Sequence, residues 1–156
     1  GCLLEGTWCS EGRGTTTPFE VLGAPGIDST RLKNELKSMD LKGVAFREIS
    51  FKPTFQKHSN KVCSGVAVHV TDVNTFLPYR TGVAVLIALN VVAPKLFEWR
   101  TDPYEFVEKI PAIDLLCGTD KIRLGIEHGE SLQNIAATWE KGQREFEALK
   151  EDFHLY

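Results

Sequence analysis

The chain has 156 residues, of which 42% are hydrophobic, and this is enough to bury the core of a single domain. Its 18 lysines and arginines against 21 aspartates and glutamates give a net charge of −3 without a basic block, which argues against a nucleic-acid partner. No apolar run reaches the roughly 20 residues of a membrane span, and the four cysteines, none in C-x-x-C spacing, indicate no metal or cofactor site.

The first residues, Cys2 to Leu4, have the composition of the middle of a β-strand, with almost nothing before them to pair with. We therefore expect the chain to be truncated at its start. No basic segment followed by an apolar stretch and a small-residue cleavage site occurs, so the sequence itself shows no signal peptide. Cys2 and Cys9 could approach each other across a loop, which leaves a disulfide open as an alternative to two free thiols.

The segment from Glu5 to Pro18 crowds carboxylates, hydroxyls, glycines and one arginine together without a hydrophobic period. Gly12 and Gly14 flank Arg13, and glycine allows positive φ or a close approach to a ligand, while the guanidinium matches a carboxylate or phosphate. This pattern favours recognition of a polar small molecule, in the simplest case an anion. A surface Glu11–Arg13 pair in a threonine-rich turn is the competing interpretation. A phosphate-binding P-loop is disfavoured, because its glycine–lysine–hydroxyl ending is missing.

A helix and two strands are predicted next along the chain. Apolar residues that recur every three to five positions predict a helix over 28–39 with a polar cap at its start, and Gly43 follows as a turn. β-branched and aromatic residues predict a strand over 44–51. Strict alternation predicts another over 62–71, with valines on one face and His69 on the other.

The remaining elements are predicted to be helical. The apolar stretch 79–93 lies between two prolines and predicts a buried helix against the sheet. A short apolar piece over 113–117 and a helix over 119–128 follow, and Ser131 caps a long final helix. The predicted core stripe of that helix consists of Ile135, Trp139, Gly142, Phe146 and Leu149.

These elements together predict one α+β domain over residues 1–156. Its expected architecture is a small mixed β-sheet flanked by helices, with a long C-terminal helix. No internal repeat, low-complexity tract or linker divides the chain.

Several motifs along the chain resemble one known family. The first are Leu4-Glu5-Gly6-Thr7, Ser10-Glu11-Gly12-Arg13-Gly14-Thr15-Thr16, Pro18-Phe19-Glu20 and Gly23-Ala24-Pro25-Gly26-Ile27-Asp28. Further ones are Phe51-Lys52-Pro53-Thr54-Phe55, Lys57-His58, His69-Val70-Thr71-Asp72, Phe97-Glu98-Trp99, Ile113-Asp114-Leu115-Leu116 with Gly118, and Leu155-Tyr156. Essentially the whole chain resembles the second half of the exo-β-N-acetylmuramidase family, formerly a domain of unknown function. Trp8 departs from the pattern, which has asparagine or a small apolar residue there.

This resemblance implies a bacterial glycoside hydrolase that removes terminal N-acetylmuramic acid from the non-reducing end of peptidoglycan fragments. In the family, a Rossmann-like amino-terminal domain carries the catalytic glutamates, and a carboxy-terminal domain caps the pocket. The present chain corresponds to the capping domain, so we expect it to be inactive alone. Its expected partners are muramic acid saccharides and the missing amino-terminal domain, and the full-length protein is expected to be periplasmic or secreted.

The resemblance makes Arg13 the first candidate for binding substrate, because arginine can bind the lactyl carboxylate of N-acetylmuramic acid bidentately. Glycoside hydrolysis usually needs two carboxyl groups, and Glu5 and Glu11 are the local candidates. Glu11 has the alternative role of orienting Arg13. The other candidate substrate-binding residues are Ser10, Gly12, Gly14, Thr15, His58 and His69. For the two histidines a structural role is the favoured alternative, His58 in a turn and His69 on the less apolar sheet face.

Two functions of other classes remain open. The chain could be a non-catalytic carbohydrate-binding module that uses the same polar loop. Alternatively, the polar loop could serve to dock the chain onto the missing amino-terminal domain.

Overall fold

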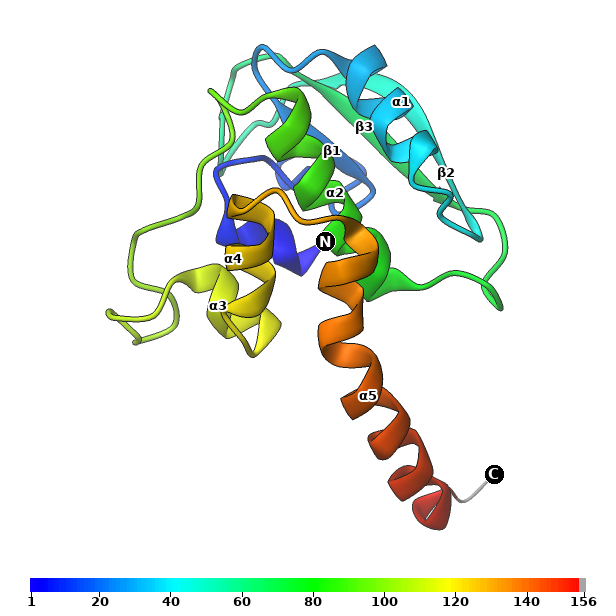
Figure 1. The fold of residues 1–156 in the computed structure, drawn as a ribbon. Helices are drawn as coiled ribbons and strands as arrows, with labels where there is room; N and C mark the ends of the chain where they lie inside the picture. The colour runs from blue at the N-terminus through cyan, green and yellow to red at the C-terminus, as the bar shows by residue number, and fades with distance from the viewer. Residues whose placement is uncertain (155–156) are drawn as a thin grey trace.

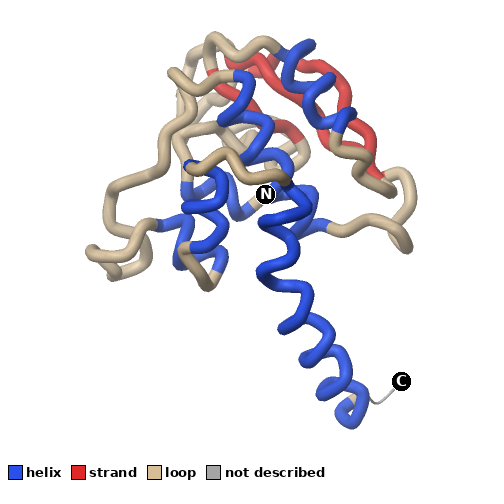
Figure 2. The backbone as a smooth tube through the Cα atoms, in the orientation of Figure 1, coloured by secondary structure: helices blue, strands red, loops and turns tan. Residues whose placement is uncertain are grey.

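A small sheet packed against helices makes up the structure, a computed structural model that describes residues 1–154 (Figure 1). Within these residues, three strands pair antiparallel in the order β1-β3-β2: β1 (Val21–Ala24), β2 (Val44–Phe51) and β3 (Cys63–Val70). Figure 2 shows the strands on one side of the molecule and most helices on the other. The α+β class is confirmed. The sheet is antiparallel throughout, however, and not mixed.

Both strands predicted from the sequence are confirmed, whereas β1 was missed because it is only four residues long and contains Gly23. Paired residues share a face of the sheet, so Val66 lies beside Leu22, and Val68 lies beside Phe46. These side chains belong to or pack against the hydrophobic core. The motif Leu155-Tyr156 lies outside the described residues.

Helix α1 (Ser29–Ser38) covers β2 and β3 and confirms the predicted helix. Leu32 and Leu36 are fully buried on its inner face. The helix begins after Asp28, whose side chain accepts a hydrogen bond from the backbone N–H of Arg31 at 3.0 Å. This bond satisfies one of the free N–H groups of the first turn.

We expect Asp28→Ala to destabilise the chain by about 1 kcal/mol, because the first turn of α1 then loses its side-chain acceptor. Urea denaturation measures this loss. The matched control is Asp120→Ala, because Asp120 stands at the N-cap of the helix that begins at Lys121 but makes no side-chain cap bond. Equal effects of the two substitutions would show that the capping bond contributes nothing.

Helix α2 (Pro78–Val92) lies at the centre of the molecule and confirms the predicted buried helix. Its first helical residue is Pro78, and it contacts α1 on one side and the C-terminal helices on the other. Buried residues face all sides of α2: Thr81, Val83, Ala84, Val85, Leu86, Ile87, Ala88 and Leu89. No helix within residues 1–154 is both long and apolar enough to cross a membrane.

The last third is helical, as predicted: α3 (Ala112–Cys117), α4 (Lys121–Glu127), α5 (Leu132–Lys150) and a short 3-10 helix, η2 (Glu151–Phe153). Ser131 caps α5 by accepting from the N–H of Asn134 at 3.2 Å. The predicted core stripe of α5 is only half right. Ile135 is buried, but Phe146 and Leu149 are 63% and 60% exposed. Periodicity identifies the apolar face of a helix, and it does not show that a partner covers this face.

The first residues form a 3-10 helix, η1 (Cys2–Gly6), so the predicted strand at Cys2–Leu4 is wrong. Helix α3 packs directly against η1. A Cβ on Gly6 would lie 2.8 Å from the Cα of Ile113, so glycine is required for this close approach. A short strand is stable only when it pairs with a neighbouring strand. Residues 2–4 have no such neighbour among residues 1–154, and they form a 3-10 helix that packs against α3 instead. Because α3 packs against η1, the position of Glu5 on η1 is fixed by this packing.

Candidate functional site

The polar loop after η1 is fastened at both ends. The N–H of Ser10 donates to the carbonyl of Gly23 at 2.8 Å, and Gly23 donates back at 3.1 Å, which attaches the loop to β1. The backbone N–H and the hydroxyl of Thr54 donate to the carbonyl of Gly14 at 2.9 and 3.0 Å. Glu11 and Arg13 are therefore held between the sheet and the connection that joins β2 to β3.

Glu11 and Lys57 form a buried ion pair beneath this loop. The Glu11 side chain is 1% exposed and that of Lys57 is 13% exposed, and Nζ donates to Oε2 at 2.9 Å. The same Nζ donates to the carbonyls of Leu4 at 2.8 Å and Cys9 at 3.1 Å. A buried charge is tolerated when it is paired and hydrogen-bonded. All three donors of one ammonium group thus tie η1, the polar loop and the β2–β3 connection together.

Arg13 links the carboxylate of Glu5 in η1 to that of Glu11 in the polar loop. Its Nη2 donates to Oε1 of Glu5, and its Nε lies 3.5 Å from Oε1 of Glu11. The hydroxyl of Tyr104 donates to the second oxygen of Glu5 at 3.0 Å. Arg13 is 34% exposed and Glu5 is 16% exposed, so these two side chains reach solvent while Glu11 does not. We call Glu5, Glu11, Arg13 and Lys57 the charged cluster.

The connection that carries Lys57 contains three left-handed residues. Gln56, His58 and Asn60 have φ values of +66°, +57° and +62°. Such a conformation costs an L-residue about 1 kcal/mol or more, and it persists where surrounding contacts impose it. The three hydrogen bonds of Lys57 are contacts of this kind. The conformational energy of these left-handed residues is therefore offset by the bonds of the charged cluster.

One exposed aromatic ring packs against the charged cluster, and two more exposed aromatic residues belong to the segments that carry it. Phe19, 45% exposed, packs under the Arg13 guanidinium, with 5.2 Å between the Cζ atom and the ring centre. Trp8 is 39% exposed, and its carbonyl accepts a hydrogen bond from Nε2 of His58 at 2.8 Å, so that nitrogen carries the proton. Phe55 follows Thr54 and is 58% exposed. Aromatic rings beside polar groups are suited to a ligand with both an apolar face and polar edges, such as a sugar.

The polar loop residues predicted from the sequence gather at this place, but several are used within the loop. Gly12 and Gly14 adopt positive φ values, +81° and +84°. The hydroxyl of Ser10 accepts from the N–H of Gly12 at 3.1 Å, and the hydroxyl of Thr15 donates to the Gly12 carbonyl at 2.6 Å. These hydroxyls therefore shape the turn that presents Arg13.

Within residues 1–154, His69 makes no hydrogen bond or ion pair with a member of the charged cluster. His69 is exposed near the end of β3, whereas the connection that carries Lys57 enters that strand at Cys63. His69 pairs with Ala45, on the sheet face opposite Val66, as predicted.

Sequence reasoning assigned no role to Lys57 or Tyr104. Lys57 belongs to one of the motifs quoted above, and its position next to His58 was the available signal. Tyr104 comes from the segment between α2 and α3, far from the polar loop in sequence. Only tertiary structure could bring this hydroxyl to Glu5.

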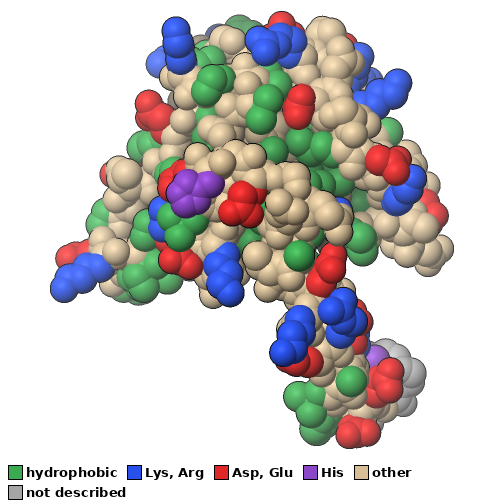
Figure 3. Space-filling model, viewed as in Figure 1, with side chains coloured by type: hydrophobic (Ala, Val, Ile, Leu, Met, Phe, Trp, Pro, Cys, Tyr) green, Lys and Arg blue, Asp and Glu red, His purple; other side chains and the backbone are tan. Residues whose placement is uncertain are grey.

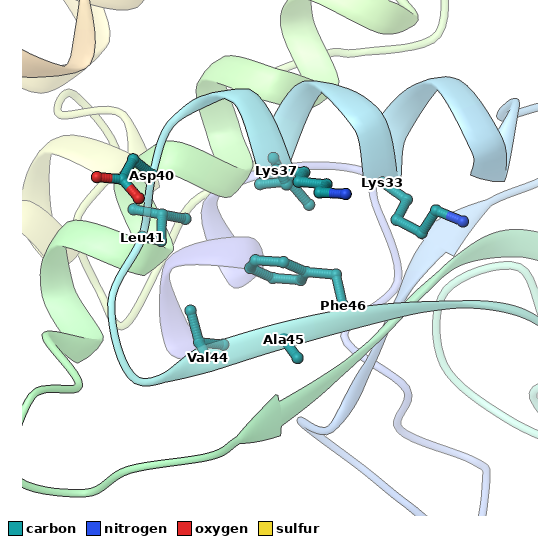
Figure 4. A pocket seen from close by; sticks show the side chains of 8 residues that line it. Lys33, Lys37, Asp40, Leu41, Val44, Ala45 and Phe46 are labelled. Carbon is teal, nitrogen blue, oxygen red and sulfur yellow. The ribbon is translucent and has the colours of Figure 1, made fainter.

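A separate hollow of about 520 Å³ lies between α1 and β2. Figure 4 shows Phe46 pointing from β2 toward α1, with Lys33 and Lys37 above it on the helix. Lys33 is already engaged with Glu48. Ligand sites combine apolar walls with polar groups that converge on the ligand. Of the other charged residues that line this hollow in the described part of the chain, Asp40 is paired with Lys42, which leaves Lys37 as a single polar group among apolar walls. We therefore place the candidate site at the charged cluster.

The cysteines are free thiols, so the Cys2–Cys9 disulfide considered above is not formed. Burial raises the pKa of Cys9 to about 12, against the lowering influence of Lys57. We expect a disulfide reagent at pH 8 to label exposed Cys2 rapidly and Cys9 only after unfolding. Cys117 is only partly buried, so the fast signal should vanish when Cys2→Ser is combined with Cys117→Ser. Fast labelling of that double variant would contradict the burial of the two remaining thiols, Cys9 and Cys63.

The raised pKa of Cys9 also predicts how the stability of the chain changes at alkaline pH. The unfolded chain releases the Cys9 proton near pH 9, while the folded chain keeps it until about pH 12. Stability should therefore fall as pH rises through this interval.

Comparison with known proteins places this arrangement in a family. A family model described as "Exo-beta-N-acetylmuramidase NamZ, C-terminal" matches residues 1–156. The chain is 41% identical over 154 residues to the "Peptidoglycan beta-N-acetylmuramidase NamZ" of Bacillus subtilis (strain 168), with 99% of this chain and 35% of that protein covered. The chain thus spans about a third of the length of this curated relative.

Two crystal structures of DUF1343 family proteins from Bacteroides fragilis NCTC 9343 are similar. One has a TM-score of 0.81 at 25% identity and covers 96% of this chain and 38% of that chain. The other has a TM-score of 0.60 at 24% identity, covers 99% and 38%, and supports the fold alone. Because the family model matches from the first residue to the last, the chain belongs to the family of exo-β-N-acetylmuramidase NamZ C-terminal regions.

Proposed function

We propose that the chain is the carboxy-terminal part of a glycoside hydrolase that removes terminal N-acetylmuramic acid from the non-reducing end of peptidoglycan fragments. In this proposal the chain supplies substrate-binding groups. The observation that carries it is the partly exposed Arg13–Glu5 pair, which lies on the buried Glu11–Lys57 pair and against the exposed ring of Phe19. The name and 41% identity of the Bacillus subtilis relative support the substrate class.

Arg13 is the proposed ligand for the lactyl carboxylate of the substrate. No residue within 1–154 accepts a hydrogen bond from its Nη1, whereas Nη2 and Nε are directed to Glu5 and Glu11. The charged cluster contains two cations and two carboxylates, so a ligand carboxylate gains directional bonds and little net charge attraction. Glu5, partly exposed, is placed to accept from a sugar hydroxyl or amide.

The chain alone is proposed to bind substrate without hydrolysing it. Hydrolysis usually needs two carboxyl groups beside the scissile bond. Glu11 is 1% exposed and engaged by Lys57, so it serves to position Arg13 and does not reach a substrate. Glu5 is then the accessible carboxylate of the charged cluster, and the second must come from the rest of the longer protein. A cell-wall substrate also suits the periplasmic or secreted location that we propose for that protein.

The test is an NMR titration with a disaccharide that carries N-acetylmuramic acid at its non-reducing end. We expect amide shifts at 11–15 without release of free sugar. We also expect binding to Arg13→Ala to be weaker by about tenfold to a hundredfold, since a charge-assisted bond contributes about 1.5–3 kcal/mol. Arg47→Ala is the control, because Arg47 is exposed on β2. Absence of binding in both this chain and the longer protein would overturn the proposal.

A non-catalytic carbohydrate-binding module is the second candidate, and the inaccessibility of Glu11 favours it. Turnover distinguishes the two. Release of N-acetylmuramic acid by the longer protein supports the hydrolase, whereas binding without release supports the binding module. Release by this chain alone would place the catalytic groups within its 156 residues.

A further inference from the structure

The second half of α5 projects away from the rest of the molecule (Figure 1). The first turns of the helix pack on α2 and α4 through Leu132, Ile135 and Ala136, which are buried. Beyond them, every residue from 141 to 149 is exposed. A helical stretch of this length is marginal in water without tertiary packing. Residues 1–154 supply no such packing to it.

The projecting half of α5 and the short helix η2 after it carry an apolar seam, which we define as Phe146, Leu149 and Phe153. Their side chains are 63%, 60% and 75% exposed. The seam continues the line of buried Ile135, half-buried Trp139 and Gly142, with alternating spacings of four and three residues. This alternation is typical of helices that pack side by side. Figure 3 shows hydrophobic side chains among charged ones on the projecting part.

We propose that this seam docks onto the amino-terminal part of the same, longer polypeptide and fixes the charged cluster relative to it. The first reason is length. The matched region is 35% of the Bacillus subtilis relative, and the family model describes it as C-terminal, so most of such a protein precedes this region.

The second reason is area. A phenylalanine buries at most about 150–250 Å², so these partly exposed side chains offer roughly 400 Å² or less. A stable complex of separate chains buries about 800 Å² per partner, so the seam is too small to join two copies by itself. A covalent tether raises the effective concentration to the millimolar range, and a small apolar contact is then sufficient.

Hydrogen exchange tests the proposal directly. In this chain alone, amides 141–150 should exchange rapidly, and in the longer protein they should exchange at least about tenfold more slowly. Phe146→Ala with Leu149→Ala should abolish that protection. Arg144→Ala with Glu147→Ala is the control on the other side of the helix. It leaves the net charge unchanged and should preserve the protection.

Two outcomes would overturn the proposal. Equal exchange in both proteins would show that nothing in the longer protein covers the seam. Protection that appears in this chain alone and grows with its concentration would identify a second copy as the partner. The seam variant should leave the melting temperature of this chain unchanged, because the removed side chains are exposed. No substrate is involved, so the result is independent of the proposed hydrolase function.

Discussion

Replacing Lys57 with methionine should destabilise the chain by about 3–5 kcal/mol, because it leaves the buried Glu11 carboxylate without its closest partner. Glu11 would keep only Nε of Arg13, at 3.5 Å. The carbonyl of Cys9 would also lose the donor it has in the structure. In a chain of this size the loss corresponds to a melting temperature lower by roughly 10 °C, which calorimetry measures.

Two further variants make this prediction specific. Lys33→Met breaks an ion pair with Glu48 that lies on the surface between α1 and β2, so it should change the melting temperature little. Adding Glu11→Gln to Lys57→Met removes the unpaired buried charge, and we expect it to restore part of the lost stability. Equal effects of Lys57→Met and Lys33→Met would show that the Glu11–Lys57 pair does not hold the loop.

Gly14→Ala should cost about 2–4 kcal/mol and weaken ligand binding. Gly14 has a φ of +84°, where a side chain adds strain. The new Cβ would also lie 2.7 Å from the carbonyl oxygen and 2.8 Å from the amide nitrogen of Phe55, and backbone atoms cannot move aside cheaply. The bonds from Thr54 that hold the loop would be displaced, and Arg13 with them. Denaturation and the saccharide titration measure the two effects.

Other glycines separate strain from steric clash. Gly118 has a φ of +69° but open space around a Cβ, so Gly118→Ala should show the strain alone, about 1 kcal/mol. Gly142 lies inside α5 with nothing near a Cβ, so Gly142→Ala should stabilise this chain by up to about 1 kcal/mol. If Gly14→Ala cost no more than Gly118→Ala, the contact with Phe55 would not be tight.

Much of the fold could be predicted from local patterns. The α1 cap, the alternation in β3 and the apolar composition of α2 each arise from neighbouring residues, so sequence reasoning located these elements. The predictions that were wrong or missing concern short segments without a clear local pattern. The segment at 2–6 is too short to show a period, and packing against α3 decides its conformation. Strand β1 exists because β3 lies beside it.

The sequence by itself identified the polar loop as the candidate site, because the glycines around Arg13 and the absence of a hydrophobic period are local features. Only the tertiary structure decided which groups the loop engages. Lys57 approaches Glu11 from 46 positions away, and Tyr104 approaches Glu5 from 99 positions away. Ion pairs and hydrogen bonds act through space over a few ångströms, so partners distant in sequence leave no periodic signal. For the same reason the sequence showed the apolar stripe of α5, and only the structure revealed that half of it lies uncovered.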